Sequence, residues 1–459
     1  MSSIELQKPF LEGGTRSINF FNGRLLTAED LSTERDINRL QHQQLGQAIG
    51  AGIVTGLQVQ LSAASSASST TSILTVLSGQ ALNRKGQVLS LPSDVDVVLV
   101  PPQTPGAVDA GMFAVCDAPT LIPVFTGYGA YILVLTPASG FEGRAPVNGV
   151  LPGDVTRASC GSRYVVEGVK FGLVQLDITT LPNISQDTRT ALAQLMTQSD
   201  LASLSMLRNR LAHLCFGTEE LGGFLSDPFR QVNGASPYVD VGALATLRTQ
   251  GKLTDCDVPL ALLYWTTKGI QFVDMGSVRR RPVPGPPSQY WPFDPAGGYP
   301  LNGEAVSVQF QEQITQMTST SIPQSQLASM RISDYFQYLP AAGIIPLSGI
   351  FSGFVIAKGF STQFLDGTTH RDPVFIEGGR VEHLIRTSLS YQPIDLSKQE
   401  MFWTYWIREN IQAITESTTN PPQPSLFFVT GHIPYQGDAQ YNIAHWQYSN
   451  FATTMNTQA

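Results

Sequence analysis

The chain has 459 residues, of which 42% are hydrophobic and only 14% are charged, and its formal net charge is -8. This length exceeds the usual size of one hydrophobic core, so we expect two to four domains. The acidic balance argues against a protein that follows nucleic-acid phosphates, because such proteins normally carry a basic stripe. The low charge content fits a surface that packs against copies or partners, since a charge buried in an interface needs a paired ion. A soluble, lightly charged monomer is the alternative.

Neither the cysteines nor the first residues of the chain carry a recognisable signal. The four cysteines lie far apart without a Cys-x-x-Cys pair, so neither zinc spacing nor a disulfide framework is visible. The N-terminus lacks the basic start and apolar core of a secretory signal, and no apolar run approaches the roughly 18 residues of a membrane span. We therefore expect synthesis in the cytoplasm and no direct membrane span. Exposure outside the cell would follow lysis or release of a particle.

The first predicted element is a polar helix near the N-terminus. Thr27 and Asp30 have the spacing of a capping box, which predicts a helix that begins near Ala28 and runs to about Ile49. We expect the helix to end at a group of glycines, because glycine disfavours helix continuation: Gly46, Gly50 and Gly52. The apolar residues at 53–59 then indicate a short strand.

The next 120 residues read as antiparallel β structure. A run of small residues at 62–71 predicts a loop between strands. Alternating or β-branched residues predict strands at 73–77, 88–91, 95–100, 131–136 and 164–178. We therefore expect a β domain before the second helical segment.

Helical spacing returns at residues 185–216, where leucines recur on one stripe and Gly217 is placed to end the helix. Strands are expected at 257–283, followed by a connector rich in proline and glycine that also contains Trp291 and Phe293. Residues 304–317 predict another helix, although the first few also alternate as a strand does. Strands are then predicted at 374–376, 402–407 and 426–430.

These elements together predict an α+β, β-rich fold with an N-terminal helix and several antiparallel β domains. The expected divisions are 1–60 (N-terminal helix and glycine turn for assembly), 61–183 (β domain), 184–222 (helical segment), 223–283 (β segment), 284–303 (Pro/Gly-rich connector) and 304–459 (β-rich C-terminal domain).

The order of motifs in the first 90 residues resembles the opening of structural proteins from contractile injection systems and related phage tails. The motifs are Gly23-Arg-Leu-Leu-Thr-Ala-Glu-Asp-Leu, the helix, Gly52-Ile-Val-Thr-Gly-Leu-Gln-Val, Gly79-Gln-Ala-Leu and Gly86-Gln-Val-Leu. Pieces at 258–264, 272–280 and 338–346 also resemble recurring parts of such proteins.

The resemblance implies a non-enzymatic structural protein at the baseplate, spike cage or fibre end of a phage-tail-like particle. Its implied partners are copies of itself in a closed ring or cage and other baseplate, spike or tail subunits, with no cofactor and no nucleic acid. Within the motifs, the assembly candidates are Arg24, Leu25, Leu26, Gly52 and Gly56. The alternative is a receptor-binding or glycan-degrading tail component, and a third possibility is a free-standing soluble enzyme.

An aromatic group at 402–406 supplies two further interface candidates, Trp403 and Trp406. Aromatic side chains anchor interfaces disproportionately. Strand alternation would place Phe402 and Tyr405 on opposite faces, so we expect one face to be core and the other to be a contact surface.

Enzymatic chemistry has to be sought among isolated residues, because no nucleophile elbow, zinc-protease helix or Walker loop is present. Asp366, His370 and Asp372 could hold a divalent metal. The same string is also an ordinary polar turn, which is our interpretation. His432 and His445 near Trp446 could line a sugar groove, but without paired carboxylates we read them as packed or surface histidines.

Two other motifs have structural interpretations. Gly50, Gly52 and Gly56 superficially resemble a dinucleotide loop, but the final spacing is one residue too long and the motif follows a helix. We expect a tight helix-to-strand turn there. Residues 279–281 are three consecutive arginines beside a strand, for which we expect a solvated strand end or an interface contact.

Overall fold

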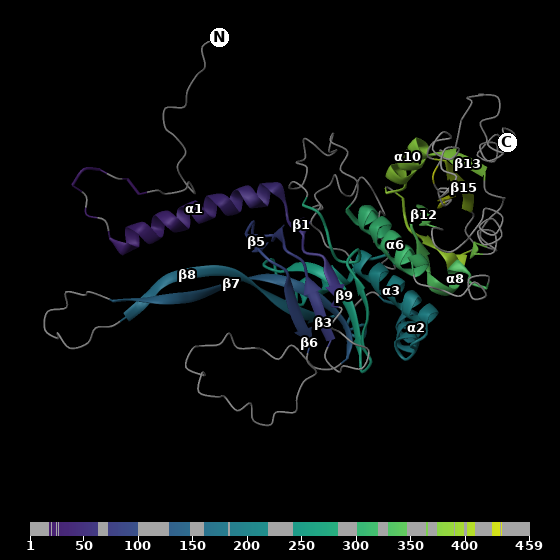
Figure 1. The fold of residues 1–459 in the computed structure, drawn as a ribbon, viewed down its shortest axis with the longest axis horizontal. Coiled ribbons are helices and arrows are strands. Elements are labelled where there is room, and N and C mark those ends of the chain that lie inside the picture. The colour runs from purple at the N-terminus through teal and green to yellow at the C-terminus, as the bar shows by residue number, and fades with distance from the viewer. Residues whose placement is uncertain are drawn as a thin grey trace, which may run out of the picture.

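A computed structural model gives the fold, shown in Figure 1. It describes residues 18–19, 21–23, 25, 27–62, 72–99, 128–146, 160–181, 184–218, 242–282, 301–319, 329–346, 364–365, 374–389, 391–398, 402–408, 425–431 and 433. The predicted α+β, β-rich class is confirmed, with an N-terminal helix followed by several mainly antiparallel sheets.

The N-terminal half is built on a four-stranded antiparallel sheet, here called the central sheet. Its order is β10-β9-β7-β8, with β7 at Gly129–Pro146, β8 at Cys160–Gln175, β9 at Val258–Thr266 and β10 at Gly269–Asp274. There are also two three-stranded sheets. The first contains β1 (Gly52–Gly56), β4 (Gly79–Leu82) and β5 (Val88–Leu91). The second contains β2 (Val59–Leu61), β3 (Ser72–Val76) and β6 (Val95–Leu99).

Alternation along β7 divides the packing between the two faces of the central sheet. Ala130, Ile132 and Val134 belong to a core shared with α2 (Gln186–Met196), α3 (Leu201–Phe216) and α5 (Gly242–Thr249). Tyr131 and Leu133 belong instead to the core shared with the two small sheets. Because both faces are covered, this part of β7 is apolar at every position.

The C-terminal half contains a second four-stranded sheet, of order β12-β16-β15-β13, in which β13 runs parallel to β15. The strands are β12 (Ala342–Pro346), β13 (Val374–Glu377), β15 (Phe402–Arg408) and β16 (Ser425–Thr430). Around it lie α6 (Leu301–Ser319), α8 (Ile332–Tyr335), α10 (Gly378–Ser388), the pair β11 (Tyr338–Leu339) and β14 (Ile394–Asp395), and the short 3-10 turn η1 (Leu396–Lys398). This half has its own core, in which Phe310 of α6 packs edge-on against Phe428 of β16.

The observed helix ends agree with the sequence prediction where capping residues could be recognised. The N-terminal helix α1 spans Ala28–Ile49, and the Thr27–Asp30 capping box forms as predicted. Helix α3 begins after Asp200, whose side chain accepts from the Ser203 amide, and ends at Gly217 in the left-handed conformation. The helix predicted at 304–317 is also confirmed as α6.

Helix α1 ends at Ile49 as predicted, with Gly46 inside it. One expectation about elements is wrong, because residues 242–249, placed in a β segment, form the helix α5. Three of the buried residues of α5 are apolar and complete the helical layer over the central sheet, a tertiary requirement that the short sequence pattern did not reveal. The connector with Trp291 and Phe293 lies outside the described residues. Among the described helices, none has the length and apolar character needed to cross a membrane.

Candidate assembly surface

Helix α1 stands away from the rest of the molecule. Among its 22 residues only Gly46 is buried. Its exposed apolar side chains include Leu31, Leu45 and Ile49, which helical spacing places on one stripe, whereas Leu40 lies on the opposite side. A polar helix with so little packing is marginal by itself in water, so α1 is suited to burial against another surface.

The root of α1 is fixed by a close contact between glycines. A Cβ atom added to Gly46 would lie 2.1 Å from the Gly86 carbonyl oxygen, and one added to Gly86 would lie 1.9 Å from the Gln43 carbonyl oxygen. Gly86 also has a φ of +75°, which disfavours other residues. The end of α1 therefore rests directly on the turn between β4 and β5.

Gly52 and Gly56, two of the assembly candidates, position β1 through backbone contacts within the chain, and Gly52 is buried whereas Gly56 is half-buried. The Ile53 amide donates to the Arg280 carbonyl oxygen at 2.8 Å, and a Cβ on Gly52 would lie 2.5 Å from the Arg281 carbonyl carbon. Gly56 and Leu57 both have positive φ, at 62° and 56°.

The three consecutive arginines are used inside the chain. Arg279 donates to the Gly56 and Leu57 carbonyl oxygens at 2.6 Å each and so holds the turn after β1. Arg280 lies over the Phe216 ring at 5.5 Å, and the Arg281 guanidinium pairs with the Glu304 carboxylate at 2.6 Å. Arg279 and Arg280 thus contact β1 and α3 within the chain, whereas Arg281 is exposed and pairs with Glu304 at the surface.

The outer part of β7 and β8 forms a second projection. Strand β9 pairs with β7 only over Gly129–Leu135, so residues 136–146 and 160–170 form a two-stranded ribbon, here called the ribbon. Phe141 is 78% exposed, and the neighbouring Tyr164, Val165 and Val166 are also exposed. An isolated two-stranded hairpin is marginal in water, so these apolar side chains are poorly placed unless something covers them.

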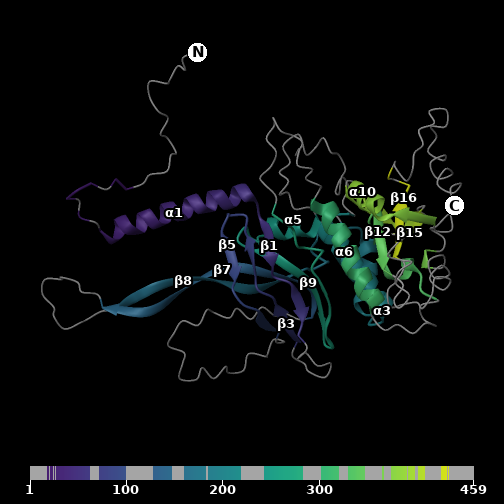
Figure 2. The ribbon, with the colours of Figure 1, turned by 45° about the horizontal axis from the view of Figure 1, so that its top comes forward.

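Helix α1 and the ribbon project from the same side of the molecule, as Figure 1 shows, and Figure 2 shows the same arrangement after rotation. Arg39 of α1 and Glu167 of β8 approach to 3.3 Å, but both side chains are largely exposed. Such a pair contributes little stability. We call α1 and the ribbon together the arm.

Trp403 and Trp406 are buried within the chain, which corrects their assignment to a contact surface. Trp406 is 1% exposed, and Phe402, Trp403 and Tyr405 are also buried. Successive side chains of β15 point to opposite faces of the sheet, and all of those at 402–406 are buried, so both faces of β15 are covered; β13 and β16 pair with its two edges. From the sequence pattern alone, an aromatic strand with both faces buried looks the same as one with an exposed face.

A buried polar network joins the two halves through α3. The Arg208 Nε atom donates to the Asp274 carboxylate at 2.5 Å, and Gln309 of α6 donates to the same carboxylate at 3.0 Å. Asn209 donates to the Tyr338 carbonyl oxygen at 3.0 Å and accepts from the Tyr338 amide at 2.9 Å. Burial, together with the nearby Asp274, raises the pKa of Glu312 above its usual value. These polar groups hold α3, β10, α6 and β11 in one arrangement.

Two buried titratable residues of α3 are held in their neutral forms. Burial lowers the pKa of His213 to about 3, and its ring stacks on Tyr338 with 4.6 Å between centroids. Burial raises the pKa of Cys215 to about 12, so its thiol is not activated. Neither residue has the environment of a catalytic nucleophile or base.

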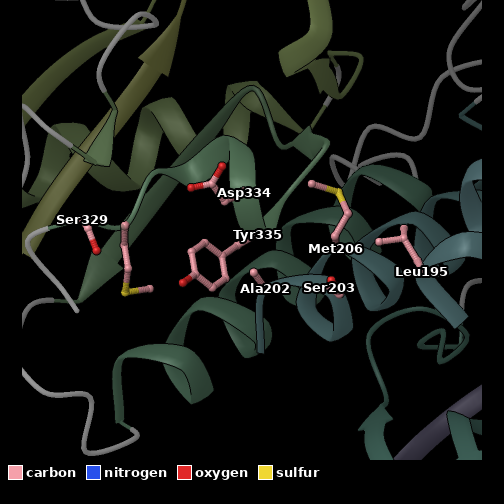
Figure 3. A pocket seen from close by; sticks show the side chains of 8 residues that line it. Leu195, Ala202, Ser203, Met206, Ser329, Asp334 and Tyr335 are labelled. Carbon is pink, nitrogen blue, oxygen red and sulfur yellow. The ribbon is translucent and has the colours of Figure 1, made fainter. Parts of the chain in front are cut away.

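A pocket of about 520 Å³ lies between the helical layer and α8 (Figure 3). It is lined by Leu195, Ala202, Ser203, Met206, Ser329, Met330, Asp334 and Tyr335. Among the described residues of this lining, Asp334 is the one carboxylate.

Several predicted residues lie outside the described part of the chain. They are Arg24, Leu26, Asp366, His370, Asp372, His432, His445 and Trp446. Leu25 is described and is 87% exposed. Among the described residues, no group of three or more His, Cys, Asp or Glu side chains could hold a metal ion.

The sequence interpretation did not single out the ribbon residues Phe141 and Tyr164–Val166 as a surface. The sequence predicted only 131–136 of β7 as a strand, so the ribbon is visible only in the pairing of β7 with β8 beyond Leu135, where β9 stops. In comparisons with known proteins, no family model matches the chain and no curated protein matches its sequence.

Proposed function

We propose that this protein is a non-enzymatic structural component of a phage-tail-like contractile injection particle, at the baseplate, spike cage or fibre end. The observation that carries the proposal is the arm, which presents apolar side chains outside a body that is already packed. The protein would be made in the cytoplasm and incorporated through the arm. Its partners would be copies of itself in a closed ring or cage and neighbouring baseplate, spike or tail subunits.

The distribution of burial supports an assembly role. Each half of the body has its own core, and the described part of α1 adds no apolar side chain to either core. Exposed apolar surface on a projecting element is typical of a surface that another protein covers. Polar and glycine contacts at the root hold α1 in place without burying its outer face.

The sequence resemblance falls on the same region and supports the choice of particle. The motif at 23–31 leads into α1, and the motif at 52–59 forms β1 and the turn held by Arg279. The motifs at 79–82 and 86–89 flank the turn on which Gly46 rests. The N-terminal motifs that carry the resemblance therefore either build α1 or surround its root.

The proposal is tested by changing the exposed stripe of α1 in the producing cells. Replacing Leu31, Leu45 and Ile49 together with Ser removes apolar surface without touching the glycine root. We expect much less of this variant in purified particles, measured by quantitative mass spectrometry, while the isolated protein keeps its helical circular dichroism.

Leu40→Ser is the matched control, because Leu40 is exposed on the opposite side of the same helix. It should enter particles at the normal level. Normal incorporation of the triple variant and of a ribbon variant, Phe141→Ser with Val165→Ser, would overturn the assembly role of the arm. Truncation is a poorer test, because removing residues 1–56 also removes β1, which pairs with β4.

A further inference from the structure

The two free edges of the ribbon differ in their capacity to accept another strand. On β7, Pro137 and Pro146 bracket the free edge, and proline lacks the amide that a neighbouring strand would need. On β8, the segment Cys160–Gln175 contains no proline, and β8 is the outermost strand of the central sheet. Among the described strands, none pairs with the outer edge of β8, and its backbone amides allow another strand to add there.

The sequence of this edge is complementary to itself in one antiparallel register. If Val165 lies opposite Val165 of a second copy, Arg163 lies opposite Glu167 and Tyr164 lies opposite Val166, each twice about the two-fold axis. Arg163, Tyr164, Val165, Val166 and Glu167 are all exposed in the single chain. Opposite charges and aromatic with β-branched residues are the cross-strand pairs that stabilise sheets.

The same register brings the exposed apolar side chains of the two ribbons together in one row. Within one chain Phe141 lies opposite Val165. Pairing two copies at Val165 therefore forms a row of four apolar residues across one face of the joined sheet, Phe141 and Val165 from each copy. Self-complementary charge and a continuous apolar row favour a second copy of this chain as the added strand.

We infer that two copies of the protein pair through the ribbon, edge to edge along β8, with Val165 at the two-fold axis. This inference names one partner of the arm and rests on the proposed assembly role. The contact is isologous, since the same edge serves in both copies. Glu167 lies near Arg39 of its own chain and gains Arg163 of the second copy as another neighbour.

A cysteine placed on the axis tests the register in the full-length protein. In a Cys160→Ser background, Val165→Cys should give a covalent dimer with a short bismaleimide, because residues directly opposite in antiparallel strands lie about 5 Å apart. Lys170→Cys is the matched control on the same exposed strand. Its two copies would lie ten residues apart in this register, roughly 33 Å, and should not be linked.

Charge exchange tests the pairing without a crosslinker. Arg163→Glu and Glu167→Arg should each raise the dimer dissociation constant roughly tenfold in sedimentation experiments, because like charges then face each other twice. The double variant should recover the wild-type constant. If Glu167 acted only through Arg39 of its own chain, the double variant would show no recovery.

The outcomes separate this inference from the proposed function. Absence of a Val165→Cys crosslink, or equal linking at Lys170→Cys, would overturn the β8 pairing whether or not the protein still enters particles. A register-specific dimer that is absent from purified particles would support the pairing and count against the proposed function. If the double variant failed to recover association, the pairing of Arg163 with Glu167 of the second copy would be wrong.

Discussion

Gly46 of α1 lies against Gly86 in the turn between β4 and β5, so closely that a single added methyl group would meet the Gly86 carbonyl oxygen at 2.1 Å. Gly46 is the one buried residue of α1. The contact joins two motifs that lie 40 residues apart in the sequence, and it sets where the helix leaves the body. The direction of the arm therefore depends on backbone proximity and not on apolar packing.

Gly46→Ala should lower the free energy of unfolding by about 1–3 kcal/mol, the range for overpacking a close contact. Alanine is the better helix former, so local propensity alone predicts the opposite sign. Gly379→Ala in α10 is the matched control, since an added Cβ there has open space around it, and it should leave stability unchanged or raise it by up to about 1 kcal/mol. Urea denaturation measures both variants, and equal effects would show that the root contact is not tight.

Arg208→Met should destabilise the protein by roughly 3–5 kcal/mol, because it leaves the buried Asp274 carboxylate without its cation. Arg386→Met is the control, since Arg386 pairs with Glu382 on the surface and should cost less than about 1 kcal/mol. Urea denaturation compares the two variants. A small effect of Arg208→Met would mean that the network does not hold the two halves together.

The stability should depend on pH through His213. Its pKa is about 3 in the folded chain against 6.5 for an ordinary histidine, so the unfolded chain takes up a proton first as the pH falls. Above pH 6.5, neutral His213 makes its full contribution to the free energy of unfolding. As the pH falls from 6.5 to about 3, that contribution decreases by about 1.4 kcal/mol per pH unit.

Denaturation at a series of pH values checks this expectation. His213→Gln should remove that part of the slope, whereas His383→Gln, at an exposed position, should keep it. Equal slopes in the wild type and in His213→Gln would show that His213 titrates normally in the folded chain.

Trp406→Ala should act on stability and not on association. Trp406 is buried in the C-terminal core, so truncation should cost about 3–5 kcal/mol of unfolding free energy. Sedimentation of the folded variant at low temperature should show wild-type association. A folded, equally stable variant with weakened association would show instead that Trp406 is an interface residue.

The sequence predicted elements well where the signals were local. The start of α1 follows from Thr27 and Asp30, and the end of α3 follows from Gly217, because capping involves residues within one turn. The role of Gly46 could not be predicted in this way, since its reason is a contact with Gly86 on another element. Likewise, both faces of β15 are covered by segments distant in sequence, so the aromatic pattern at 402–406 left its exposure undetermined.

The candidate surface was predicted only in part. The N-terminal motif directed attention to α1, and Leu25 is indeed exposed, but Gly52 and Gly56 serve the backbone turn held by Arg279. The ribbon was missed because residues 137–146, which contain two glycines and two prolines, were not predicted as a strand. Only the register shows that β9 stops at Leu135, so that among the described strands only β8 pairs with the outer part of β7.

Amide hydrogen exchange of the free protein and of the protein in purified particles tests the assembly role of the arm most directly. The free protein should exchange quickly at residues 31–42 of α1 and at 163–168 of β8, where most side chains are exposed. Incorporation should slow exchange in both segments by at least about tenfold, because another surface then covers them. Unchanged exchange in the arm, with new protection confined to the C-terminal half, would contradict the account.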